Sequence, residues 1–196
     1  MILITLSLIY HQDFLFAISA IILFILSIIP LLMRRNYKVS LPWGLEFLIV
    51  IILLLHILGS YYNFFVNFRF YSPMMHFLGT ALIAFLAYGI VYTLNMTKKI
   101  RLSHLMIGIF TLIFALAIGA IWEIGEFTLD QNLGTYSQGD GIDPLTDTMY
   151  DLIWDGVAGL FIAIVGQTWM KTYPQITNFF KKIFRKLKIF KPLNKI

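Results

Sequence analysis

Long apolar runs separated by short polar segments dominate this chain. Five runs, at about 14–33, 45–64, 74–94, 105–129 and 150–170, can each cross a hydrocarbon core of about 30 Å at about 1.5 Å per residue. Pro42, Pro73 and Ser103 precede or begin three of them and are typical of helix starts. The pattern predicts an all-α, polytopic transmembrane bundle of five spans over residues 1–172, followed by a tail, 173–196. Residues 1–12 are left without an assigned role, because the apolar stretch 1–10 fits an interfacial segment or an extension of the first span.

Composition agrees with this class. The 196 residues are 59% hydrophobic and only 13% charged, against about 25% charged in ordinary soluble domains. The chain has no cysteine, which excludes disulfides, thiolate metal sites and a cysteine nucleophile. Its start lacks the positive region of a secretory signal, so we expect the N-terminus to be retained.

The basic residues predict an orientation. They gather after the first span, after the third span and in the tail, whereas the loop after the second span has only Arg69 and the loop after the fourth has none. Short cytosolic loops are enriched in Lys and Arg. We therefore expect a plasma-membrane protein with its N-terminus outside and its C-terminus in the cytosol. The basic residues of the first two groups are Arg34, Arg35, Lys38, Lys98, Lys99 and Arg101.

Ionisable residues in the apolar runs are the candidate chemistry. Such groups cost roughly 2.5–3.5 kcal/mol or more each at the bilayer centre, and they usually have a function. Helical geometry places them in the outer half of the membrane: a histidine on the third span, two glutamates three apart on the fourth, and aspartates four apart at the fifth. These residues are His76, Glu123, Glu126, Asp147, Asp151 and Asp155.

Carboxylates and imidazole on neighbouring helices suit a divalent cation. The candidate metal ligands are His76, Glu123, Glu126, Asp147 and Asp151, and the candidate catalytic residues are His76, Glu123 and Asp151. Two other readings stay open: a general acid–base pair without metal, and hydrogen bonds between helices or solvation at the rim, with Asp147 as a helix cap. His56, deeper in the second span, is expected to be a packed histidine, and His104 a solvated residue at a helix end.

The segment 130–147 and the tail are the main features outside the spans. The segment has three glycines and Pro144, and its length is typical of functional loops; Asp140 and Asp143 could extend the site. In the tail, Phe179, Phe180, Ile183, Leu187 and Phe190 recur at helical spacing among basic residues. This predicts an amphipathic helix that binds anionic lipid of the inner leaflet, and no nucleic acid.

Three ordered motifs resemble the YjdF-type integral membrane proteins of bacteria and archaea, and more remotely the VanZ-like proteins. They are HFLGT at 76–80, WEIGEF at 122–127 and QGDGIDPLTDTMYDLIWDGVAG at 138–159. The resemblance covers roughly residues 40–170 and implies that the family's polar positions are His76, Glu123, Glu126, Asp140, Asp147 and Asp151. Related proteins often have an aspartate four residues before the histidine, where this chain has Ser72.

Three functions fit these observations. The first is a metal-dependent enzyme acting on a lipid-linked or envelope substrate at the outer leaflet. The second is a non-catalytic membrane scaffold in which the acids bond the helices together. The third is an ion- or proton-coupled transporter, which the one-sided gathering of the acids and the lack of an inverted repeat disfavour. No nucleophile elbow, nucleotide loop or HExxH motif occurs in the chain.

Overall fold

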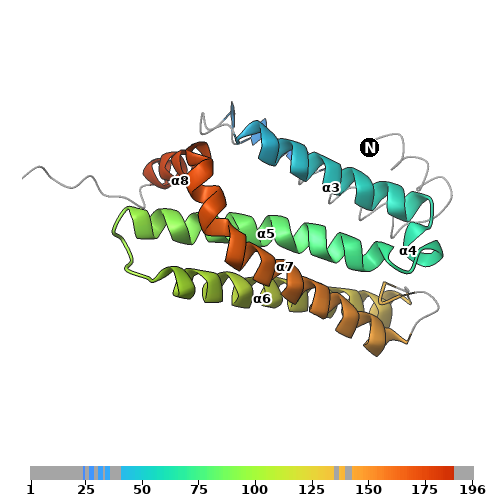
Figure 1. The fold of residues 1–196 in the computed structure, drawn as a ribbon. Helices are drawn as coiled ribbons and strands as arrows, with labels where there is room; N and C mark the ends of the chain where they lie inside the picture. Colours follow the sequence, from blue (N-terminus) through green and yellow to red (C-terminus); the bar gives the residue numbers. More distant parts are fainter. Residues whose placement is uncertain are drawn as a thin grey trace, which may run out of the picture.

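A computed structural model describes residues 41–134, 137–139 and 143–187, with positions 24, 27, 28, 31, 32, 34 and 35. The described residues between 41 and 187 form helices and no strands (Figure 1). Their bounds are α3 Trp43–Tyr61, α4 Phe64–Asn67, α5 Tyr71–Met96, α6 His104–Leu133, α7 Pro144–Thr172 and α8 Pro174–Lys186.

Four of these helices, α3, α5, α6 and α7, are long and apolar enough to cross a membrane. They correspond to the second through fifth predicted spans. Most of the first predicted span, 14–33, and His11 lie outside the described residues.

The helix ends are set by local capping. The Ser103 hydroxyl accepts a hydrogen bond from the Met106 N–H at 3.2 Å, which confirms the predicted cap. At α7 the cap is Asp143, whose carboxylate accepts from the Thr146 N–H at 3.0 Å. The alternative that Asp147 caps this helix is therefore wrong, because Asp147 lies in its first turn.

The predicted loop 130–147 was too long. Helix α6 continues to Leu133, where Gly134 ends it in the left-handed conformation (φ 65°), and α7 begins at Pro144. The apolar pattern stops before the helix does, so hydropathy alone misplaced this end. The Asp130 carboxylate then accepts hydrogen bonds from the backbone N–H groups of Ser137 and Gln138, at 2.7 and 2.9 Å.

Helices α5, α6 and α7 pack against one another and form the centre of the bundle, with α3 against α5 (Figure 1). Small residues allow α6 and α7 to approach closely. A Cβ atom on Gly159 of α7 would lie 2.7 Å from the Ala115 Cβ of α6, and one on Gly108 would lie 3.4 Å from the Ala163 Cβ.

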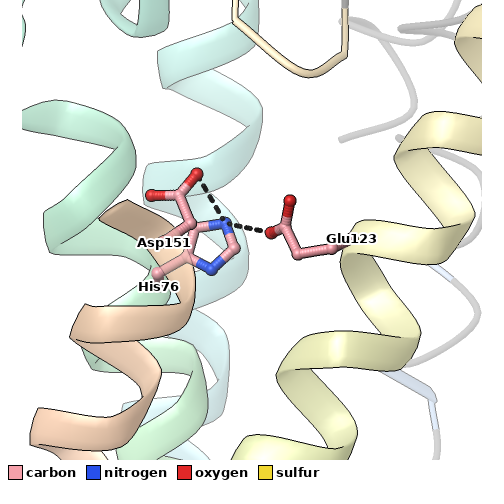
Figure 2. A group of neighbouring side chains, drawn as sticks. All are labelled: His76, Glu123 and Asp151. Atoms are coloured by element: carbon pink, nitrogen blue, oxygen red, sulfur yellow. Dashed lines mark ion pairs between the residues drawn. The ribbon is translucent and has the colours of Figure 1, made fainter. Parts of the chain in front are cut away.

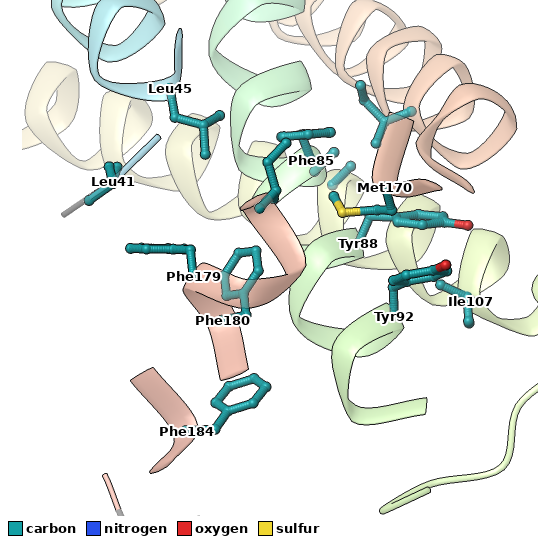
Figure 3. Close-up of a cluster of buried hydrophobic side chains, with 14 residues drawn as sticks. Leu41, Leu45, Phe85, Tyr88, Tyr92, Ile107, Met170, Phe179, Phe180 and Phe184 are labelled. Carbon is teal, nitrogen blue, oxygen red and sulfur yellow. The ribbon is translucent and has the colours of Figure 1, made fainter. Parts of the chain in front are cut away.

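Helix α8 folds back onto the bundle against α5 and α7. Its buried aromatic side chains, Phe179, Phe180 and Phe184, join one apolar cluster with Leu41 and Leu45 (Figure 3). A Cβ atom on Gly89 of α5 would clash with the Phe180 ring, so glycine makes room for that ring. The apolar face expected to meet lipid thus contacts protein in this region, whereas Leu187 is exposed.

The bundle has two chemically different ends. One end, here called the basic end, carries α8, the start of α3 and the connection between α5 and α6 with Lys98, Lys99 and Arg101 (Figure 1). The opposite end, here called the α4 end, carries α4, the start of α5, the end of α6 and the start of α7. The candidate site lies toward the α4 end.

Candidate functional site

Three helices each bring one ionisable side chain to a common point. His76 is on the second turn of α5, Glu123 is ten residues before the end of α6, and Asp151 is on the second turn of α7. The His76 Nε2 atom lies 3.4 Å from Asp151 Oδ2 and 3.7 Å from Glu123 Oε1 (Figure 2). One ligand atom from each residue lies within 4.8 Å of the others, so the three side chains can share one ion.

The other ring nitrogen of His76 faces a fourth ionisable residue. His76 Nδ1 lies 3.4 Å from Asp155 Oδ1, and the same oxygen accepts a 2.5 Å hydrogen bond from the Thr80 hydroxyl. Asp155 is one turn beyond Asp151 on α7, and it is fully buried. The imidazole is therefore held between carboxylates on both sides.

Burial distinguishes this cluster from a solvated rim. Glu123 is 4% exposed and Asp151 is 1% exposed. Among the described residues, neither Glu123 carboxylate oxygen has a hydrogen-bond partner, and neither does Asp151 Oδ1 or Asp155 Oδ2. Carboxylates taken out of water without hydrogen bonds cost several kcal/mol each unless a cation or a shared proton compensates them.

Ser72 also reaches the cluster. Its hydroxyl donates a 3.1 Å hydrogen bond to Asp151 Oδ2. It lies on the first turn of α5, one turn before His76. Position 72 therefore faces the site, and a neutral donor there orients the Asp151 carboxylate.

The remaining sequence candidates do not belong to the three-residue group, although Glu126 and Asp147 are near enough to interact electrostatically with His76. Glu126 accepts a 2.8 Å hydrogen bond from the Trp122 indole on its own helix. Asp147 packs against Gly139, which has φ +90° and where a Cβ would lie 2.8 Å from the Asp147 Cγ. Asp140 lies outside the described residues.

The two other histidines among the described residues, His56 and His104, are not members of the three-residue group, although His56 is near enough to His76 to interact with it electrostatically. The His56 ring makes edge contacts with Phe65 and Trp122, at centroid distances of 5.3 and 6.5 Å, as a packed histidine does. His104 is exposed at the first residue of α6, at the basic end.

The predicted set of site residues left out Asp155, which faces the His76 ring, and Thr80, which donates to Asp155. Asp155 belongs to the recognised four-residue aspartate stripe, and Thr80 follows His76 by one helical turn. The spacing by four was therefore a usable signal for both. Which ring nitrogen each carboxylate faces depends on helix packing, and the sequence carries no sign of it.

The two ligand separations that involve His76 Nε2 fit a small divalent ion. A tetrahedral ion with bonds of about 2.0–2.2 Å separates its ligand atoms by about 3.3–3.6 Å. The distances of 3.4 and 3.7 Å from His76 Nε2 are close to this range. One imidazole and two carboxylates form a hard-to-borderline ligand set, which suits zinc, manganese or iron(II).

Comparison with known proteins gives a family and no reaction. Residues 1–172 match the family described as "Predicted membrane protein (DUF2238)". The chain belongs to this family. The chain is therefore a membrane protein, in agreement with the four long apolar helices of its described part and with the likeness to YjdF-type proteins.

A protein of Thermotoga maritima, named "Uncharacterized protein", is 36% identical over 101 residues. That match covers 50% of this chain and 48% of the relative, so the chain spans about half the length of the curated relative that it matches. No solved structure matches the chain.

Proposed function

We propose that this membrane protein binds one divalent cation at His76, Glu123 and Asp151, and that the bound cation serves an enzymatic reaction on a lipid-linked or envelope substrate. The observation that carries the proposal is the convergence of three ligand atoms, from three helices, within 4.8 Å. The unpartnered carboxylate oxygens of Glu123 support it, because an ion would compensate them.

The ligand count favours catalysis over a structural metal. Catalytic zinc sites commonly have three protein ligands and leave a position for water or substrate, whereas structural sites use four. A divalent ion in such a site supplies Lewis-acid polarisation of a carbonyl or phosphoryl oxygen, or a bound water of lowered pKa. Glu126 and Asp147 would be neighbouring acids and not ligands of the same ion.

Depth in the membrane points to a substrate at an interface. His76 follows the start of α5 by five residues and Asp151 follows the start of α7 by seven, which is about 8–11 Å of helix. Aromatic rings of Tyr61, Tyr62, Phe64 and Phe68 contact one another at this end of the bundle, as in the aromatic belts of membrane boundaries. This depth suits a lipid headgroup or its linkage.

The proposed orientation places the site at the outer face. With a fifth span at 14–33, the N-terminus is outside, the basic end is in the cytosol and the protein lies in the plasma membrane. The exposed Lys181, Lys182, Arg185 and Lys186 of α8 would then face anionic lipid of the inner leaflet. The remote resemblance of the sequence to VanZ-like proteins also stays a prediction.

A scaffold is the second candidate, and one observation favours it. The short hydrogen bond from Thr80 to Asp155, together with the His76–Asp155 contact, ties α5 to α7 without any ion. The His76–Glu123 contact at 3.7 Å joins α6 to the same scaffold. It leaves both Glu123 oxygens without a hydrogen-bond partner of good geometry among the described residues, and an ion would compensate them. The transporter alternative has no comparable support.

The test is metal binding by the purified protein. After removal of metal with a chelator, titration with Zn²⁺ or Mn²⁺ should give one site per chain by calorimetry. Asp151→Asn should weaken this binding strongly, whereas Asp143→Asn, a substitution of the same kind at the α7 cap, should not. Absence of saturable binding in the wild-type protein would reject the proposal.

A further inference from the structure

The histidine of the cluster has two nitrogens in different surroundings. Among the described residues, Nε2 faces Glu123 and Asp151, and Nδ1 faces Asp155 at 3.4 Å. An ionised carboxylate only accepts hydrogen bonds, so each ring nitrogen that faces one needs a proton or a cation between them. At Nε2 a cation shared with Glu123 and Asp151 would replace the proton, whereas Nδ1 keeps its proton toward Asp155. In the neutral ring, Nε2 is then left as the acceptor.

We infer that Asp155 is a positioning residue: it holds the proton on His76 Nδ1, so that the Nε2 lone pair is directed at a cation between Glu123 and Asp151. This inference rests on the proposed function. Histidines that bind metal usually donate their other N–H to a carboxylate or carbonyl, which fixes the ring and increases its basicity.

Asp155 is itself held in place from two other helices. Thr80 of α5 donates to the same oxygen that faces the imidazole. On α6, Gly119 lies against the carboxyl group, and a Cβ there would lie 2.8 Å from the Asp155 Cγ and 3.1 Å from its Cβ. Glycine at this position gives α7 room to place a carboxylate between two neighbouring helices.

Asp155 is unsuited to be a fourth ligand of the same ion. The group whose ligand atoms lie within 4.8 Å of one another contains His76, Glu123 and Asp151 and does not include it. Its contact is with the ring nitrogen that faces away from that group. Asp155 is fully buried, and its Oδ2 atom has no hydrogen bond from the residues that the structure describes. Burying such a carboxylate is costly, and orienting the histidine gives a reason for its presence.

Two measurements on the full-length protein test the inference. The first is the ¹⁵N chemical shift of the His76 ring, measured at a pH high enough that the ring is neutral, which reports which nitrogen carries the proton. The wild-type protein should have Nδ1 protonated, and Asp155→Leu, which keeps the approximate shape but removes the acceptor, should lose that preference. A bare Nδ1 in the wild-type protein, or unchanged shifts in the variant, would overturn the inference.

The second measurement is affinity for Co²⁺, followed by its visible absorption. Asp155→Asn retains a carbonyl acceptor without the charge and should weaken binding by about 10-fold, and Asp155→Leu by about 100-fold, the range found for such outer partners. Equal affinities in the wild-type and both variants would contradict a positioning role. If the wild-type protein binds no metal, the proposed function fails, and the ring shifts still decide whether Asp155 sets the tautomer.

Discussion

Replacing Glu123 by glutamine should change stability and metal affinity in opposite directions. The Glu123 carboxylate is 4% exposed, it lies 3.7 Å from His76 Nε2, and neither of its oxygens has a hydrogen bond among the described residues. In the metal-free protein the His76 ring compensates the burial of this group only in part. Glutamine keeps the shape, removes the charge and offers an amide donor to the facing acceptors.

The Glu123→Gln variant should be more stable because it no longer buries a carboxylate without hydrogen bonds. An unsatisfied buried polar group costs about 1–3 kcal/mol, and more when charged. Removing such a cost should raise the Tm of the metal-free protein by about 2–12 °C, since 1 kcal/mol corresponds to roughly 2–4 °C in a chain of this size.

The loss in affinity follows from the ligand count. Losing even an outer partner of a metal ligand costs about 10–100-fold. The loss of one of three direct ligands should therefore weaken Zn²⁺ binding by at least about 100-fold, which is about 2.8 kcal/mol.

The assay is thermal unfolding in detergent with chelator and with added Zn²⁺, together with calorimetric titration. Glu126→Gln is the matched control, because Glu126 lies three residues away on the same helix and accepts a hydrogen bond from Trp122 at 2.8 Å. It should leave affinity unchanged and should not raise the metal-free Tm. If Glu123→Gln destabilised the metal-free protein and left affinity intact, Glu123 would be a structural hydrogen-bonding group and the reasoning would fail.

Three further outcomes are expected. A membrane-impermeant reagent should label a cysteine introduced at Ser137 but not one at Ser103 in intact cells, and the reverse pattern would invert the proposed orientation. Phe180→Ala should lower the free energy of unfolding by about 3–5 kcal/mol, because the Phe180 ring is buried against Gly89 and Met170. The control Lys181→Ala, at an exposed side chain, should change it by less than about 0.5 kcal/mol. Equal effects of the two substitutions in chemical denaturation would contradict the packing of α8. Zn²⁺ affinity should fall when the pH is lowered from neutral to about 5, because carboxylates and imidazole bind metal only when deprotonated, and a pH-independent affinity measured by titration would argue against this ligand set.

The apolar pattern was sufficient for the architecture over the described residues. A membrane span must satisfy every backbone hydrogen bond internally, so about 20 apolar residues in a row leave helix as the only choice. Ser103 as a cap and the start of α3 after Pro42 could be read directly, since both depend on adjacent residues. The end of α6 could not, because the helix extends beyond the apolar run to Gly134.

The candidate site, too, could be predicted from the sequence only in part. Sequence spacing put His76, Glu123 and Asp151 at one depth, because rise per residue and loop order fix depth without any knowledge of packing. It also grouped Glu126 and Asp147 with them, because residues three or four apart share a helix face. Only the tertiary structure separates Glu126, bonded to Trp122, from Glu123, which faces His76. The rotation of each helix about its axis decides this, and close contacts such as Gly159 against Ala115 fix that rotation between helices far apart in sequence.

The tail was also predicted in part from the sequence and decided in part by the fold. Its amphipathic spacing determined that a helix would form with one apolar and one basic face. Spacing gives no sign of what covers the apolar face, since lipid and protein are equally apolar. The fold decided it, because Gly89 leaves space on α5 for the Phe180 ring. The basic residues of α8 are left exposed at the end of the bundle where the cationic connection between α5 and α6 also lies.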